Sequence, residues 1–522
     1  MKNRTRTLFF TRAIVIVITL AVAICGTLAG AQSEPAVSAS TTEGAAYGDW
    51  PQYEQNPFRI PITIPLWSGN QYRNDKGGLV IHDVTGDGLK DFVISFKEGP
   101  EQDDSGDAYI GVYSHHGEEI WAEQVDMRLN MKAEYAGLPG HFGPGFYIAD
   151  IDGDGRPELL HIDTSDRLVI RDARTGAVKR TGAVELPEGG GRWGGMVQVC
   201  NFRGMGMVDA LLQAEYEGGD SRNAPDPHNP FHRLTAVKLD SYEDGEFEVL
   251  WHNTDYIGGR HYGARAMDLT GNGRDDVAGA VIVNHEGKIA HEWRLPEEGF
   301  AHYDSIKVQN ARPDLPGLEV FVITEGGEEW VAMVNHDEGV VYRSSFQNEE
   351  PQKGAVGQFD PERPGLESWW ANKESNYRHP FVFDSKGELI AAYDFKSKFP
   401  PEGQERDWST GSTTFIDWKG TETQQAFMRG RYDHPSLGGV ANPVIFDPMS
   451  GEIIEWFDTP VRQCFPADVS GDYREEIVGI DGETNELVIW WNPEPNERER
   501  PRYWNHQWYR VAMQIMDAYS VK

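Results

Sequence analysis

The stretch Asp150-Ile-Asp-Gly-Asp-Gly-Arg-Pro-Glu158 recurs in altered form along the chain and decides the fold. It consists of an aspartate, a turn rich in Gly and Asp, and an acidic residue eight positions after the first, and an apolar run follows it. Self-similarity of this kind is the sequence signature of a repeat architecture. Three further segments share the pattern: Asp83-Val-Thr-Gly-Asp-Gly-Leu-Lys-Asp91, Asp268-Leu-Thr-Gly-Asn-Gly-Arg-Asp-Asp276 and Asp468-Val-Ser-Gly-Asp-Tyr-Arg-Glu-Glu476.

Weaker copies fill the intervals between these four segments. They begin at Asn201, Asn310, Asp360 and Asp417, so the anchors fall at 83, 150, 201, 268, 310, 360, 417 and 468. This spacing is about one four-stranded sheet per repeat. Each such sheet exposes two apolar faces, so it must pack on its neighbours in a ring. The sequence therefore predicts an all-β chain, an eight-bladed β-propeller, with seven or nine blades as alternatives.

The Asp/Gly loops have the composition of a site for a hard cation. Carboxylates at alternating positions, with Gly where the backbone turns sharply, let a short loop wrap oxygen ligands around calcium. The alternative is that Asp-Gly turns cap the strands without a metal. We expect Ca²⁺ as a structural cofactor. The candidate ligands are Asp83, Asp87, Asp91, Asp150, Asp152, Asp154, Glu158, Asp268, Asn272, Asp276, Asp468, Asp472 and Glu476.

The N-terminus has the signature of export. Basic residues from Lys2 to Arg12 precede an apolar run and the small-residue segment Ala29-Gly30-Ala31, as in a secretory signal peptide. The apolar run is too brief to cross a bilayer comfortably. We expect a signal peptide at 1–31, a flexible leader at 32–48 and a single β-propeller domain at 49–522. The product would be secreted or periplasmic, monomeric and without a membrane span.

Composition restricts the partners. The chain has 48 Lys and Arg against 83 Asp and Glu, a formal net charge of −35. Nucleic acid is not expected as a partner, because phosphate binding needs a basic face. A polyanion would also be repelled at long range unless bound cations or a local basic cluster attracted it. The sequence lacks a Gly-x-Ser-x-Gly elbow, a phosphate loop and a dinucleotide fingerprint, which argues against the corresponding hydrolases, kinases and dehydrogenases.

A basic and aromatic set of residues precedes the anchors. Residues about six to nine positions upstream of each anchor should project at one end of the ring, because each anchor follows an equivalent inner strand. The set predicts an anionic ligand at the channel mouth. For any single member, the alternative is a polar residue that closes the channel. The members are Lys76, His141, Arg192, Trp193, Arg260, His261, Tyr262, His302, Tyr303, Lys353, Trp408 and Arg462.

An ordered series of segments also carries a family resemblance. The series runs through Gly259-Arg-His-Tyr-Gly-Ala-Arg-Ala-Met-Asp-Leu-Thr-Gly-Asn-Gly273, Ile282-Val-Asn-His-Glu-Gly-Lys288, His302 and Pro316-Gly-Leu-Glu-Val-Phe321, and continues at 360–367, 415–418 and 468–478. It resembles the rhamnogalacturonan lyases of polysaccharide lyase family 11 over most of the chain after about Gly77. The Asp/Gly loops themselves resemble calcium-binding FG-GAP repeats.

Propeller-type ulvan lyases are similar as well. Their His pair resembles His141 and His161, and a later Arg/Tyr group resembles Arg260 and Tyr262. Both groups of enzymes cleave bonds in which rhamnose is attached to a uronic acid.

The resemblance implies a lyase that cleaves rhamnose–uronic acid linkages of a rhamnogalacturonan- or ulvan-type polymer by β-elimination. A cation neutralises the uronate carboxylate, a base removes the C5 proton and an acid protonates the departing oxygen. The implied base is His141 or His261 and the implied acid is Tyr262. Arg260 and Arg192 would neutralise the carboxylate, with a calcium ion as a further candidate for that role. The remaining substrate contacts would come from Lys76, Arg192, Trp193, His302, Tyr303, Lys353 and Arg462.

Two alternatives stay open at this point. One is a non-catalytic, integrin-like calcium propeller that binds carbohydrate or protein, because the same ring hosts both functions. The other is a degenerate lyase that binds sugar without cutting it.

Overall fold

The computed structural model describes residues 53–65, 76–97, 107–129, 143–216, 233–256, 264–279, 281–292, 302–325, 330–345, 351–372, 379–395, 408–434, 438–496 and 502–515. The described residues form strands and connecting turns apart from two short helices, η5 (Tyr503–Asn505) and α1 (Gln507–Ala512). They all belong to one compact unit, Val37–Lys522. Within them, no helix has the length and apolar character needed to cross a membrane. The prediction of an all-β chain is confirmed.

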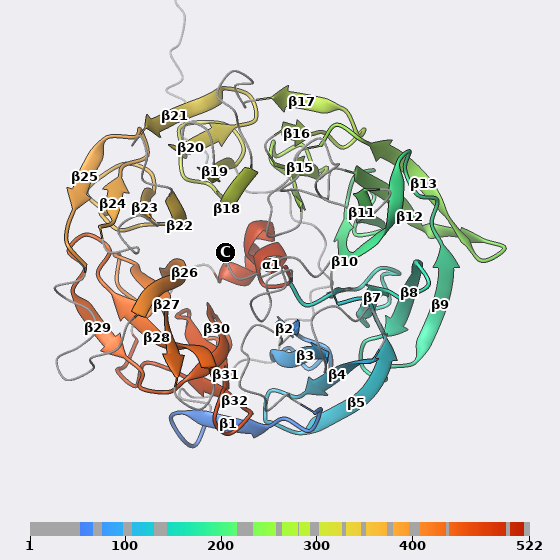
Figure 1. Cartoon of the computed structure of the whole chain (residues 1–522), viewed down its shortest axis with the longest axis horizontal. Coiled ribbons are helices and arrows are strands. Elements are labelled where there is room, and N and C mark those ends of the chain that lie inside the picture. Colours follow the sequence, from blue (N-terminus) through green and yellow to red (C-terminus); the bar gives the residue numbers. More distant parts are fainter. Residues whose placement is uncertain are drawn as a thin grey trace, which may run out of the picture. The chain divides into compact units, whose positions relative to one another are not determined.

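The strands pair into four four-stranded sheets and two eight-stranded sheets. A single residue pair joins the two halves of each eight-stranded sheet, Glu246 with Ala183 in one and Ala441 with Val461 in the other. Hydrogen bonding therefore arranges the strands in groups of four. In Figure 1 the first strands of the groups, such as β2, β18 and β22, lie toward the centre, and the fourth strands, such as β5, β17 and β25, lie at the periphery.

The bounds of the strands follow this grouping. The first strands are β2 (Lys76–His82), β6 (Phe146–Ala149), β10 (Gly190–Cys200), β14 (Arg265–Met267), β18 (His302–Gln309), β22 (Pro351–Gly357), β26 (Trp408–Ile416) and β30 (Val461–Ala467). The second are β3 (Asp91–Lys97), β7 (Glu158–Ile162), β11 (Asp209–Tyr216), β15 (Asp276–Ala278), β19 (Glu319–Glu325), β23 (Glu367–Asn372), β27 (Gln425–His434) and β31 (Glu476–Asp481). The third are β4 (Asp107–Tyr113), β8 (Arg167–Asp172), β12 (Arg233–Glu243), β16 (Val281–Val283), β20 (Trp330–Asn335), β24 (Phe381–Phe383), β28 (Gly438–Phe446) and β32 (Glu486–Trp490). The fourth are β5 (Glu119–Asp126), β9 (Val178–Ala183), β13 (Glu246–Asn253), β17 (Ile289–Glu292), β21 (Gly339–Ser345), β25 (Leu389–Ala392), β29 (Ile453–Trp456) and β1 (Phe58–Pro61).

Each Asp/Gly loop joins the first strand of a group to the second. The loop at 83–91, for example, follows β2, and its last residue begins β3. Because these two strands are antiparallel, the loop lies at the end of the first strand. We call this side the loop end, and the side at which the first strands begin the start end. The second strands are buried on both faces, as β7 and β23 show, because neighbouring groups cover them.

The last group is completed by the N-terminal strand. β1 pairs antiparallel with β32, with Phe58 opposite Ile489 and Ile60 opposite Leu487. Ile60 is fully buried in the main hydrophobic cluster. The first and last described parts of the sheet structure are therefore hydrogen-bonded to each other.

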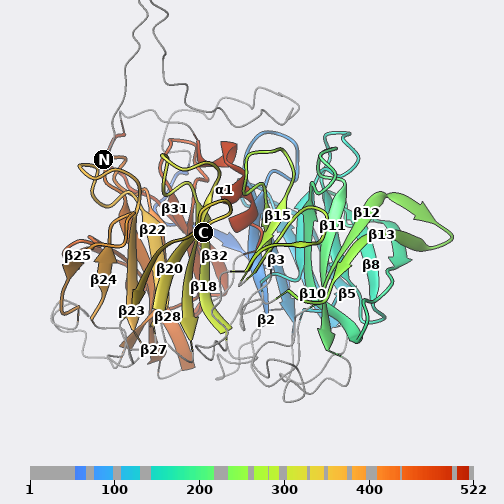
Figure 2. The same cartoon turned by 90° about the horizontal axis from the view of Figure 1, so that it is seen from above.

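The C-terminal segment 502–515 contacts several groups at the loop end. Gln507 Oε1 accepts from the amide of Asp268 at 2.9 Å, and Gln514 Oε1 accepts from the amide of Ile148 at 3.1 Å. Tyr509 accepts from the amide of Asp468 at 2.8 Å. Figure 1 shows α1 near the centre, and Figure 2 shows it toward one end of the strands. One short segment thus ties three groups together.

Candidate metal loops and substrate end

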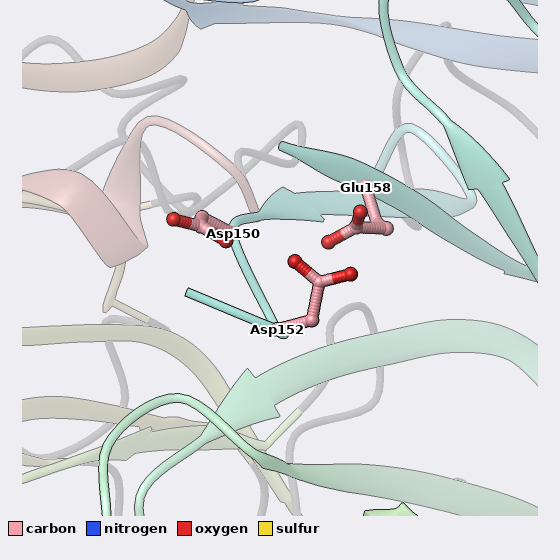
Figure 3. A group of neighbouring side chains, drawn as sticks. All are labelled: Asp150, Asp152 and Glu158. Atoms are coloured by element: carbon pink, nitrogen blue, oxygen red, sulfur yellow. The ribbon is translucent and has the colours of Figure 1, made fainter. Parts of the chain in front are cut away.

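The second loop brings three carboxylates together. Oxygens of Asp150, Asp152 and Glu158 lie within 4.8 Å of one another. In Figure 3 the carboxylates of Asp152 and Glu158 face each other, and Asp150 lies beside them. Among the described residues this is the group of three with the spacing of a metal site. Asp154, a fourth predicted ligand, instead accepts from the amide of Arg156 at 2.8 Å.

The loops at 83–91, 150–158, 268–276 and 468–476 are called the full loops here. In each full loop the first aspartate accepts a hydrogen bond from at least one backbone amide of its own turn. In the first loop Asp83 accepts from the amides of Gly86 and Gly88, at 2.7 and 2.9 Å. Both glycines have positive φ, 76° and 88°, a conformation that other residues adopt only at a cost. Asp150 makes the same pair of bonds with Gly153 and Gly155. The loop shape is therefore fixed by bonds that need no metal.

The residue that begins each second strand works as a backbone acceptor. Asp91 Oδ2 accepts from the amides of Val84 and Thr85, at 2.9 and 2.8 Å. Glu476 Oε2 accepts in the same way from Val469 and Ser470. The equivalent side chains in other groups bond one or two amides of their own loops: Glu158, Asp209, Glu319, Glu367 and Gln425. This position therefore has a structural role both in the Asp/Gly loops that match the pattern closely and in the degenerate ones.

A lysine sits on the second loop. Lys179, on β9, pairs with Glu158 and with Asp152 Oδ2, the latter at 3.0 Å. Burial alone would raise the pKa of Asp152, but its bond with Lys179 lowers it. Lys179 was not predicted, because it lies outside the loop and its spacing from it follows no motif.

The third and fourth loops each hold a buried oxygen with no partner among the described residues. These atoms are Oδ2 of Asp276 and Oδ2 of Asp468. Burial raises the pKa of Asp468 to about 7, and nearby Arg502 opposes the rise. In the fourth loop Arg474 donates to Asp472 Oδ2 from Nε and Nη2, at 2.8 and 2.6 Å. In the third loop Asn272 Oδ1 accepts from the amide of Arg274 at 2.8 Å.

The predicted substrate residues cluster at the beginnings of first strands. Lys76 and His302 begin β2 and β18, and Arg462 is the second residue of β30. The backbone thus places these positions at the start end. The side chains of Lys76, His302, Tyr303 and Arg462 lie outside the described part of the chain.

Three predicted substrate residues have described side chains. Trp193 has 0% exposure and belongs to the main hydrophobic cluster, and Lys353 has 1%. Burial argues against direct contact of either side chain with a sugar, because neighbouring groups cover both faces of a strand. Arg192 on β10 is partly exposed. It is the described basic residue of the predicted set that reaches solvent.

The predicted catalytic residues, His141, Arg260, His261 and Tyr262, lie outside the described residues. His161, the partner of His141 in the ulvan lyase resemblance, is described on β7. It is fully buried, which lowers its pKa to about 3, and its Nε2 accepts from Arg171 Nε at 3.1 Å. A neutral, enclosed imidazole of this kind is a packing histidine in this structure.

Comparison with known proteins shows which proteins this chain is similar to. Residues 236–401 match the model of the rhamnogalacturonan lyase family 11 C-terminal domain. The rhamnogalacturonan endolyase YesW of Bacillus subtilis (strain 168) is 23% identical over 508 residues, which is 89% of this chain and 75% of the relative.

Solved structures show the same fold in enzymes and in another class of protein. The structure of the exotype rhamnogalacturonan lyase YesX aligns with a TM-score of 0.65 at 17% identity, over 90% of this chain and 81% of that one. The Vibrio cholerae biofilm matrix protein Bap1 aligns with a TM-score of 0.55 at 12% identity, over 89% of this chain and 98% of that one. The family model and the relatives agree with the order of segments in the sequence, and this chain is similar to the rhamnogalacturonan lyases of family 11.

Proposed function

We propose that the protein is a polysaccharide lyase that cleaves rhamnose–uronic acid linkages of a rhamnogalacturonan by β-elimination. The observation that carries the proposal is the match of residues 236–401 to the lyase family, together with relatives named as rhamnogalacturonan lyases over most of the chain. The fold alone would not decide it, because Bap1 has a similar fold.

The fold that supports this function is an eight-bladed β-propeller. Each of the two eight-stranded sheets divides at a single residue pair, and the remaining sheets have four strands, which gives eight groups of four. In such a ring the starts of first strands from distant parts of the chain meet at one mouth. The positions of Lys76, Arg192, His302 and Arg462 then belong to one substrate end.

The chemistry requires three roles at that end. A fixed cation neutralises the uronate carboxylate, so that the C5 proton becomes acidic. A base takes this proton and an acid protonates the leaving oxygen. We assign the first role to Arg260 and Arg192, the base to His141 or His261, and the acid to Tyr262. His141 with Tyr262 is the better pair, because His261 and Tyr262 are adjacent and point to opposite faces if they lie in a strand.

We further propose that the full loops hold structural Ca²⁺. Supporting this, the second loop has three carboxylate oxygens within 4.8 Å, and buried oxygens of Asp276 and Asp468 have no partner among the residues that the structure describes. The ligands would be Asp83, Asp87 and Asp91 in the first loop, and the corresponding predicted residues in the others. Bound Ca²⁺ would neutralise buried carboxylates that otherwise repel one another.

The test is to incubate the protein with rhamnogalacturonan, ulvan and rhamnose-free polygalacturonate, and to follow unsaturated uronate by ultraviolet absorbance. We expect unsaturated product from rhamnogalacturonan. His141→Ala and Tyr262→Phe should each lower kcat by about 10²–10⁴-fold, the usual contribution of a general acid or base. Full activity of both variants would remove the two assignments.

A protein that binds the polymer without releasing unsaturated uronate would contradict the lyase proposal and support the non-catalytic alternative. Export is a separate proposal, and the expected result is a mature N-terminus near Gln32 in protein recovered outside the cytoplasm.

A further inference from the structure

The start of β10 is rich in glycine on both sides of Arg192 and Trp193. The sequence from 189 to 195 is Gly-Gly-Gly-Arg-Trp-Gly-Gly. Its pairing with β11 is irregular between Gly190 and Arg192, and again between Trp193 and Val197. Glycine-rich backbone loses much conformational freedom when it is ordered. Arg192 and Trp193 pair with Glu215 and Ala214 of β11 only between these two irregularities, so contacts from other strands add to the support of this segment.

The structure shows what holds it. Arg128, which follows β5, donates from Nη1 to the carbonyl of Trp193 at 2.6 Å. Asp166, in the turn between β7 and β8, accepts from the amide of Trp193 at 2.8 Å. Arg128 and Asp166 also pair with each other. Both main-chain polar groups of Trp193 are thus bound by one ion pair, whose two members come from outside the group that contains β10.

Arg128 is itself fixed on three sides. Its Nη2 donates to the carbonyl of Thr164 at 2.9 Å, and its backbone amide donates to Ile162 at 2.8 Å. The side chain is 6% exposed. On the other side, a Cβ placed on Gly195 would clash with the Arg128 carbonyl, so the two backbones touch. A buried guanidinium with its acceptors arranged this way is a rigid support.

We propose that the Arg128–Asp166 pair positions Arg192 for the uronate carboxylate. This inference rests on the proposed function. The pair is at the start end, since Asp166 lies in the turn that follows β7, and β7 runs from the loop end to the start end. Arg128 and Asp166 are positioning residues that act through the main chain of Trp193, and Arg192 is the residue that contacts substrate.

The chain offers a matched control at the opposite end of the same group. Arg203 pairs with Asp209 and Asp240, at 2.6 and 2.7 Å, at the loop end of β10, β11 and β12. Arg203→Met therefore removes an arginine–carboxylate pair from this group without touching the start end.

The experiment is a double-mutant cycle on KM and kcat with rhamnogalacturonan. We expect Arg128→Met, Asp166→Ala and Arg192→Gln each to raise KM about tenfold and also to lower kcat, because Arg192 binds the carboxylate in the substrate and neutralises it further as the C5 proton leaves. The double variant Arg128→Met with Arg192→Gln should have a KM only slightly higher than that of either single variant. Arg203→Met should leave KM unchanged.

Additive effects of Arg128→Met and Arg192→Gln would overturn the inference, as would an unchanged KM in a folded Arg128→Met protein. Should Arg128→Met not fold, Asp166→Asn keeps a similar shape, removes the ion pair and is judged by the same criteria. Failure of the proposed function looks different. In that case wild type releases no unsaturated uronate, and the same cycle is measured as dissociation constants for a rhamnogalacturonan oligosaccharide. In that measurement, additive effects of Arg128→Met and Arg192→Gln on the dissociation constant would count against positioning of Arg192 by Arg128, and non-additive effects would support it.

Discussion

The loop at 83–91 and the loop at 358–367 occupy the same place in two groups but differ in composition. In both, the acidic residue that begins the second strand accepts from two loop amides: Asp91 from Val84 and Thr85, and Glu367 from Phe359 and Asp360. Only the first has an aspartate bonded to two glycine amides. In the second, Asp360 pairs with Arg363 at 3.0 Å instead. The acidic residue that begins the second strand therefore has the same structural role in both loops. The aspartates at the start and middle of the loop are what distinguish a candidate cation site.

The largest expected effect tests the common element. Glu367→Ala should destabilise the fold by about 2–4 kcal/mol, because it leaves two amides without an acceptor in a buried loop. Glu367→Gln keeps an acceptor oxygen and should cost much less. Denaturant unfolding measures both. Equal losses for Ala and Gln would show that the carboxylate charge matters, and not the hydrogen bonds.

A cation should separate the two kinds of loop. Ca²⁺ at about 100 times its dissociation constant should stabilise wild type by about 2.7 kcal/mol per site. Asp87→Asn, in the first loop, should reduce the calcium-dependent rise in Tm, and Asp360→Asn should not. A chelator that leaves Tm unchanged would contradict calcium in the full loops.

The pH dependence provides a sharper comparison. Burial raises the pKa of Glu367 to about 7, against backbone hydrogen bonds that lower it. A pKa above the unfolded value means that ionisation opposes folding, so stability falls as pH rises from about 4.5 through 7. Glu367→Gln should remove up to about 3 kcal/mol of this fall, since the rise of the Glu367 pKa from 4.5 to about 7 corresponds to that free energy. Parallel stability curves for wild type and Glu367→Gln between these pH values would disprove the shift.

The smallest effect concerns Lys179. Its ammonium pairs with Asp152 and Glu158 and competes with a metal for them. Lys179→Met should therefore tighten Ca²⁺ binding by the second loop about tenfold, measured by calorimetry. Lys238→Met, which breaks the surface pair with Glu248, is the matched control and should not change calcium affinity. If the calcium affinity of Lys179→Met is unchanged, Lys179 does not compete measurably with the metal for Asp152 and Glu158.

The sequence repeat predicted the groups of strands well, because Asp-Gly turns have strict backbone requirements. It placed the sixth anchor at Asp360, whereas the hydrogen bonds to Glu367 make Gln358 the first residue of that loop. The loop at 358–367 is one residue longer than the loop at 83–91. Asp360 therefore lies two residues after the first position of its loop and is not equivalent to Asp83. Spacing along a strand also could not show that Trp193 and Lys353 are buried, since that depends on the neighbouring group. Arg128 and the C-terminal segment lie outside the repeat, so no periodic signal marked them.

The pairing of β1 with β32 has a consequence for how the molecule forms. Phe58 pairs with Ile489, so β1 cannot complete its pairing until β32, more than 400 residues later in the chain, has been synthesised. Contacts between residues so distant in the chain slow folding, because the whole intervening polypeptide must be ordered before they are gained. The final group can assemble only after β32 has been synthesised, and a chain cut short before β32 would leave β1 without its partner.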